Sequence, residues 1–211
     1  MRFPVACAVL LALLAAASCK RSGPASVDPL DKVPSSLGAV VFGPSLVEAT
    51  SQVLALTQRL EATQGTQRTS SLGADLAARI GFDPFTAEGL AKAGFKPDGA
   101  FVVAVDPEGS GNTWILPVAD GEKALTALEG FARQAEQADR ISQEKIENVT
   151  LKTFARPFGS REVPVMTAAL DGGFLIVARG PKAAALVRAA LSTRREESFG
   201  QGALMKSMGT S

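Results

Sequence analysis

The chain has 211 residues, with 22 Lys and Arg against 21 Asp and Glu, no His and no Tyr. This length suits one domain or at most two small ones, and a formal net charge of +1 gives no basis for a nucleic-acid partner. Without His, zinc sites built on histidine and Ser-His-Asp or Cys-His catalysis are excluded. Any metal would be a hard cation bound by oxygen ligands, and we expect no cofactor.

The first residues have the pattern of a secretory signal. Arg2 supplies a positive charge, and residues 5–17 form an apolar run of 13 that ends two residues before Cys19. A membrane-spanning helix needs roughly 20 apolar residues, whereas a run of this length suits a signal peptide. We therefore expect an exported protein from which residues 1–18, including Cys7, are removed.

The segment Ala16-Ala17-Ser18-Cys19 resembles the lipobox of bacterial lipoproteins. The resemblance implies that the Cys19 thiol receives a diacylglycerol and that a dedicated peptidase cuts just before this residue. Lipoproteins of this class are held in a membrane by their acyl chains, palmitate among them. By the sorting rule of the class, Lys20 in place of Asp favours the outer membrane over the inner one.

Two other interpretations of this segment stay open. An ordinary A-x-A site at Ala15-Ala16-Ala17 would be cut after Ala17 and would leave Cys19 as a free thiol. Alternatively, Cys19 is an incidental small residue. In each case the mature chain has no second Cys, so burial rather than a disulfide must stabilise it.

A tether and a folded domain are predicted after the signal. Residues 19–35 comprise Cys19 and a polar stretch of 16 residues with three prolines. Such a stretch reaches at most about 50 Å when extended and about 22 Å on average when flexible. The domain is then residues 36–211, and its last residues fit either a chain end or the N-terminal part of a longer protein.

The first half of the domain predicts one strand and three helices. Residues 37–42 are a strand candidate, and Ser45 with Glu48 forms a capping box that begins a helix. Apolar residues at helical spacing predict one buried stripe on this helix: Leu46, Ala49, Val53, Leu56 and Leu60. Two short helices are predicted at 72–80 and 87–93, the second closed by Gly94.

The second half contains a rough internal repeat of strand, Asp-led turn, strand and helix. The first copy has strands at 100–105 and 113–118 and a helix at 122–138. The second copy has strands at 164–170 and 174–178 and a helix at 181–191, with a further strand at 149–155 between the copies. Two such ββα-like units predict an α+β fold, with an antiparallel sheet and helices packed on one face.

This order of elements is similar to that of an uncharacterised family of exported bacterial proteins. The similarity would cover about residues 33–211 and includes a Gly-x-Asp-Pro segment, here Gly81, Asp83 and Pro84. It implies no known chemistry.

Two short motifs resemble known sites. Residues 106–112 place oxygen ligands at alternate positions, as a calcium loop does, but Pro117 stands where a bidentate Glu is required. A hairpin turn is therefore favoured.

Ser142-x-x-Lys145 matches the nucleophile motif of penicillin-recognising enzymes, whose S-D-N and K-T-G motifs do not occur in the chain. A chance match is favoured, and Trp114 is expected in the core.

These observations predict a lipid-anchored exported protein with a non-enzymatic binding or scaffolding role at the bacterial envelope. Cys19 is the only site residue predicted, for lipidation, and no catalytic, cofactor or metal residue is predicted. The expected partners are the membrane, through the lipid, and an envelope protein. One alternative is a cofactor-free hydrolase using Ser or carboxylates, which requires a concave pocket of converging side chains. The other is an accessory subunit of an envelope complex, which requires an exposed apolar patch.

Overall fold

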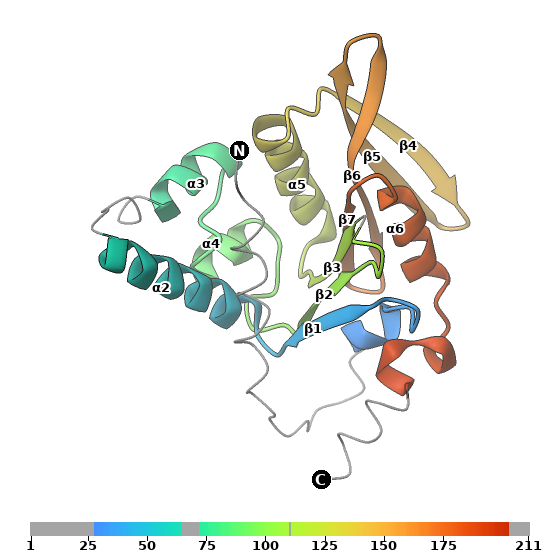
Figure 1. Cartoon of the computed structure of the whole chain (residues 1–211), viewed down its shortest axis with the longest axis horizontal. Coiled ribbons are helices and arrows are strands. Elements are labelled where there is room, and N and C mark those ends of the chain that lie inside the picture. The colour runs from blue at the N-terminus through green and yellow to red at the C-terminus, as the bar shows by residue number, and fades with distance from the viewer. Residues whose placement is uncertain (1–27, 65–71, 110, 203–211) are drawn as a thin grey trace.

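Seven antiparallel strands form one sheet in the computed structural model, which describes residues 28–64, 72–109 and 111–202 (Figure 1). Their order across the sheet is β1-β2-β3-β7-β6-β5-β4. The strands are β1 (Ala39–Gly43), β2 (Phe101–Val105), β3 (Asn112–Pro117), β4 (Arg140–Ile146), β5 (Val149–Phe158), β6 (Arg161–Asp171) and β7 (Phe174–Arg179). Helices and antiparallel strands occupy separate layers, so the predicted α+β class is confirmed.

Five α-helices and three short 3-10 helices accompany the sheet within the described residues. They are α2 (Leu46–Gln64), α3 (Leu72–Ile80), α4 (Ala87–Lys92), α5 (Gly121–Ala135), α6 (Ala183–Ser192), η1 (Pro29–Lys32), η3 (Arg195–Glu197) and η4 (Phe199–Gln201). Asp120 caps α5 by accepting a hydrogen bond from the backbone N–H of Lys123 at 3.1 Å. The Lys123 side chain also bonds this carboxylate and lowers the pKa of Asp120. None of the described helices is long and apolar enough to cross a membrane.

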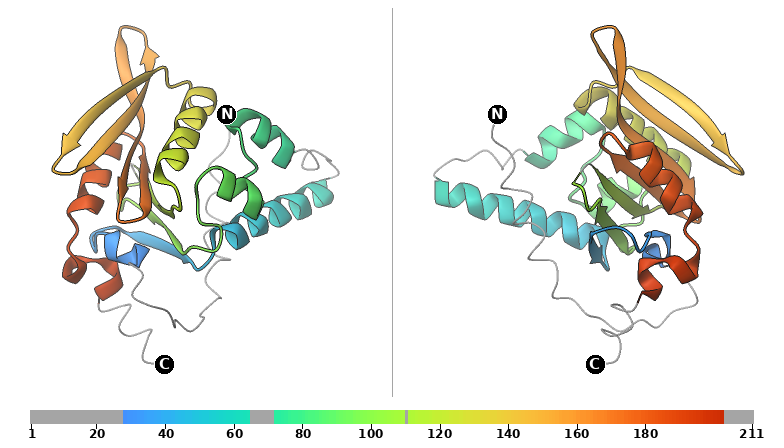
Figure 2. Two further views of the ribbon diagram at one scale, coloured as in Figure 1. Left: turned by 180° about the vertical axis from the view of Figure 1, so that it is seen from behind. Right: turned by 45° about the vertical axis from the view of Figure 1, so that its right-hand side comes forward.

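The helices cover both faces of the sheet, whereas the sequence predicted one covered face. Helix α5 packs through Ala124, Leu125 and Ala132 against one face, and α6 packs through Ala183, Val187 and Ala190 against the other. Figures 1 and 2 show these two helices on opposite sides of the strands. The reason lies in the central strands: the five consecutive residues 174–178 are all buried. A strand that is apolar on both sides must be covered on both sides.

The predicted tether ends earlier than expected, because residues 28–35 belong to the folded body. Leu30 is 2% exposed and Val33 0% exposed, both in the core on the α6 face. The Asp28 carboxylate accepts a hydrogen bond from the Leu30 N–H at 3.0 Å and caps η1. The prolines that indicated a linker are compatible with this structure, since Pro29 occupies the first turn of η1. The prediction of a tether through residue 35 is thus wrong for residues 28–35.

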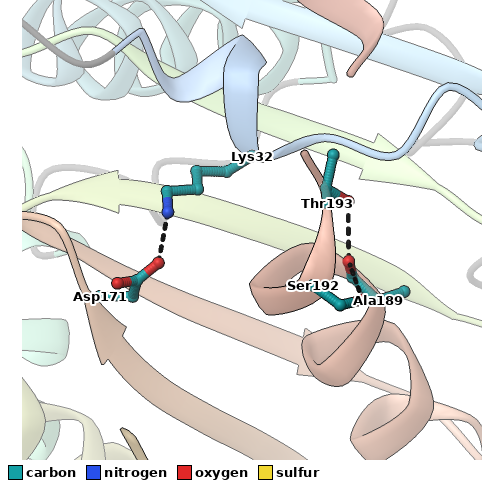
Figure 3. A network of polar contacts seen from close by, with 5 residues as sticks. All are labelled: Lys32, Asp171, Ala189, Ser192 and Thr193. Atoms are coloured by element: carbon teal, nitrogen blue, oxygen red, sulfur yellow. Dashed lines mark hydrogen bonds and ion pairs between the residues drawn. The ribbon is translucent and has the colours of Figure 1, made fainter. Parts of the chain in front are cut away.

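Polar contacts hold η1 against the end of β6. The Lys32 ammonium forms an ion pair with the Asp171 carboxylate (Figure 3).

Close by, at the C-terminal end of α6, the hydroxyls of Ser192 and Thr193 donate to the Ala189 carbonyl at 3.2 and 2.7 Å. These bonds satisfy a carbonyl in the last turn of α6, where the carbonyl groups have no N–H partner within the helix.

The substitution Leu30→Ala is expected to lower the free energy of unfolding by about 2 kcal/mol. This is the lower end of the range for a buried Leu, and we expect it because η1 lies near one end of the folded body. Chemical denaturation monitored by circular dichroism measures the change. Ser36→Ala, at an exposed position nearby, is the control and should have little effect. Equal stability of the two variants would contradict the assignment of residues 28–35 to the body.

Candidate functional site

The hairpin of β5 and β6 projects beyond the rest of the sheet. Strand β6 pairs with β7 only from Met166 to Asp171. Residues 161–165 therefore extend past the end of β7, and residues 161–164 pair with β5 alone. Figures 1 and 2 show the hairpin standing clear of both helical layers. Its turn contains Gly159 with φ of +61°, a left-handed conformation that favours glycine.

One face of this hairpin carries two arginines and two exposed apolar side chains. The register places Arg156 opposite Val163 and Phe158 opposite Arg161. Residues directly opposite share a face, as do residues two apart along a strand, so these four side chains form one surface. Phe158 is 71% exposed and Val163 37% exposed. We call Arg156, Phe158, Arg161 and Val163 the hairpin face.

A groove of about 610 Å³ lies at the base of the hairpin. Arg156 and Val163 line it, which makes the groove continuous with the hairpin face. The other lining residues come from β6, the β2–β3 turn, the end of α5 and the end of β7: Val105, Gly109, Gly111, Asn112, Glu136, Pro164, Val165, Arg179, Gly180 and Pro181. Arg179 forms an ion pair with Glu136, so the one acidic side chain in the lining is neutralised.

The opposite face of the hairpin has a different charge. Glu162 lies opposite Pro157, one residue out of phase with the hairpin face, and therefore points to the other side. Its carboxylate is 3.5 Å from the guanidinium of Arg140 on β4. Within the hairpin, the acidic residue and the exposed arginines are thus separated by face.

The sequence resembling a calcium loop forms the turn between β2 and β3, as predicted. The N–H of Gly109 donates to the Asp106 carbonyl at 2.8 Å. The Lys182 ammonium lies 2.5 Å from a Glu108 carboxylate oxygen and 3.7 Å from one of Asp106. The hydrogen bond to Glu108 raises the pKa of Lys182. Among the residues that the structure describes, no cluster of three or more His, Cys, Asp or Glu could hold a metal ion.

Ser142 and Lys145 do not form a dyad. Both lie on β4, opposite Thr153 and Thr150 of β5. An offset of three residues in a strand places the two side chains on opposite faces of the sheet. The four-residue match therefore brings no lysine to this serine.

Cys19 and the signal segment lie outside the described residues, as do residues 203–211. The hairpin face was not predicted from the sequence. A local signal exists, because Phe158 stands beside the turn residue Gly159 and between two arginines. No protein-family model matches the chain, and comparisons with curated proteins and with solved structures found no match.

Proposed function

We propose that this chain is a lipid-anchored protein of the bacterial envelope whose folded body binds a protein partner. The signal pattern that ends at Cys19 supports the anchor. The projecting hairpin, which exposes Phe158 to solvent, is the single observation that carries the binding role. Aromatic and Arg side chains are enriched at interaction surfaces, and here Phe158 and Val163 lie exposed on the same face as two arginines.

The position of the hairpin relative to the anchor is compatible with a partner other than the anchoring membrane. Lys32 of η1 contacts Asp171, at one end of β6, while Arg161 lies at its other end, ten residues earlier. Ten residues of strand span about 33 Å. From Cys19 to Asp28 there are nine residue steps, which reach at most about 32 Å even when extended.

The hairpin tip is therefore about as far from η1 as the anchor can be. When β6 stands upright on the membrane with η1 nearest to it, the tip lies about 33 Å beyond η1, on the side of the body away from the anchor. In this arrangement the hairpin faces the aqueous compartment, where a protein partner would approach it.

Cys19→Ser is expected to move the protein from the membrane fraction to the soluble fraction of the producing bacterium, because no thiol remains to carry the lipid. Cys7→Ser is the matched control and should leave the protein in the membrane, since Cys7 lies in the segment to be removed. The intact mass of the membrane-extracted protein should correspond to a chain that begins at lipid-modified Cys19. A native species that begins at Ser18 without lipid would contradict the anchor.

A further inference from the structure

We infer that the hairpin face, together with the groove at its base, binds an acidic segment of the partner protein that carries an apolar side chain among its carboxylates. This inference rests on the proposed function, because it specifies the chemistry of the partner at the same hairpin. Three observations support it: exposed apolar side chains gather on this face, its two arginines have no carboxylate partner, and their charge opposes the binding of a second copy of this chain.

The apolar groups of the hairpin face are concentrated there. Among the described residues, the large hydrophobic side chains that are exposed are Leu60, Phe158 and Val163. Two of these three belong to the hairpin face, and the groove of about 610 Å³ continues from them. Cavities of roughly 300–1,000 Å³ are large enough to enclose a small ligand. The groove can therefore receive an apolar side chain of the partner while Phe158 packs beside it.

The charge of this face favours carboxylates in the partner. Arg140 and Arg179 are paired with Glu162 and Glu136. In the part of the chain that the structure describes, Arg156 and Arg161 have no carboxylate within ion-pair distance. Each stands directly opposite an exposed apolar side chain. A guanidinium binds a carboxylate through two parallel hydrogen bonds. The face therefore presents two pairs, each of one Arg and one apolar side chain, and a partner segment in which acidic and apolar residues alternate would complement them.

The same charge disfavours a second copy of this chain as the occupant. If two copies packed hairpin face against hairpin face, Arg156 and Arg161 of one would meet those of the other, and juxtaposed like charges oppose association. Edge-to-edge pairing of two β6 strands is also hindered, because Pro164 lacks an N–H and Glu162 adds a charge to the edge. An acidic partner meets neither obstacle.

A selection from random decapeptides displayed on phage tests the inference. The target is the full mature chain with Cys19→Ser, purified as a soluble protein. The selected peptides are expected to be enriched in Asp and Glu around an aromatic or aliphatic residue. Their affinity, measured by fluorescence anisotropy of labelled synthetic copies, should weaken with increasing salt, since exposed ion pairs are screened.

Two variants locate the binding site. Phe158→Ser removes the apolar group, and Arg156→Glu reverses a charge; each should weaken the peptide Kd at least about tenfold. Leu60→Ser and Arg79→Glu are the matched controls, since both residues are exposed but lie on α2 and α3. The controls should leave the Kd unchanged. Circular dichroism of all four variants checks that they are folded.

Four outcomes would overturn the inference. They are no enrichment of peptides, selected peptides without acidic residues, peptides that bind the Phe158→Ser and Arg156→Glu variants normally, and a competing occupant. Light scattering that shows a dimer lost in Phe158→Ser would identify a second copy as the occupant. Binding of vesicles of anionic phospholipid, lost in the same variant, would identify a lipid surface. A failure of lipidation at Cys19 leaves this test unaffected, because the target carries no lipid.

Discussion

Phe154→Ala is expected to lower the free energy of unfolding by about 3–5 kcal/mol, the range for a large aromatic side chain removed from a core. Phe154 is 0% exposed and lies on β5 between Ile141 of β4 and Met166 of β6. It belongs to the core on the α5 face. Truncation removes apolar area from this core and leaves a cavity that the surrounding strands can fill only in part.

Phe158→Ala is the matched control, because it makes the same substitution four residues along the same strand. With its side chain 71% exposed, Phe158 should contribute less than about 0.5 kcal/mol to stability. Guanidinium denaturation of both variants measures the difference. Similar losses of stability would mean that the hairpin packs against the body, and would remove the basis for an interaction surface at its tip.

Gly94→Ala is expected to lower the free energy of unfolding by about 3 kcal/mol. Gly94 has φ of +91° and closes α4: its N–H donates to the Ala91 carbonyl and the N–H of Phe95 donates to the Leu90 carbonyl, both at 3.0 Å. This is a Schellman motif. A left-handed conformation costs a residue with a Cβ about 1–2 kcal/mol.

Crowding adds to this cost. A Cβ at Gly94 would lie 2.4 Å from the Asp120 carbonyl oxygen and 2.7 Å from the Ala124 nitrogen, so α4 and the start of α5 would have to separate. Overpacking of this kind typically costs about 1–3 kcal/mol.

Gly81→Ala separates the two contributions. Gly81 has a similar φ, +84°, but beyond its neighbours in the chain no atom lies within 4 Å of the position of its Cβ. Only the conformational cost of about 1–2 kcal/mol should remain. Thermal unfolding of the two variants by calorimetry is the measurement. If Gly81→Ala were as destabilising as Gly94→Ala, the close contact between α4 and α5 would not explain the effect.

The internal repeat could be predicted because its signals are local. Buried strands in this chain are short apolar runs, and the turn between β6 and β7 is marked by Gly172 and Gly173, with φ of +58° and +84°. The placement of α5 and α6 on opposite faces had a local signal too, in the uninterrupted apolar run of β7. A strand whose apolar residues do not alternate with polar ones is covered on both sides.

Strand β4 was missed because its sequence has no strand pattern. Most of its residues are exposed, and the segment RISQEKI is largely polar. It is a strand because every one of its residues pairs with β5, at the edge of the sheet, where charged side chains protect against further pairing. A sequence pattern that measures burial cannot detect a strand that is not buried.

The hairpin face could not be predicted for a different reason. Its four side chains share a surface because of the pairing register of β5 and β6, which includes an irregularity between Phe154 and Ala155. They are exposed because β7 ends at Arg179, opposite Met166. The register across Gly159 and Ser160 is local, but the end of β7 is set by a strand distant in the sequence and cannot be read from residues 156–163 alone.

The two ends of the folded body meet, which makes the path of the chain almost a closed ring. The N–H of Phe199 donates to the Val33 carbonyl at 2.8 Å, and Pro34 pairs with Ser198. Proteins whose ends lie close together often tolerate circular permutation. Joining residues 202 and 28 through a short linker and opening the chain between Gly159 and Ser160 would move both ends to the hairpin tip. A lipid attached there would turn the body over and direct the hairpin face toward the membrane.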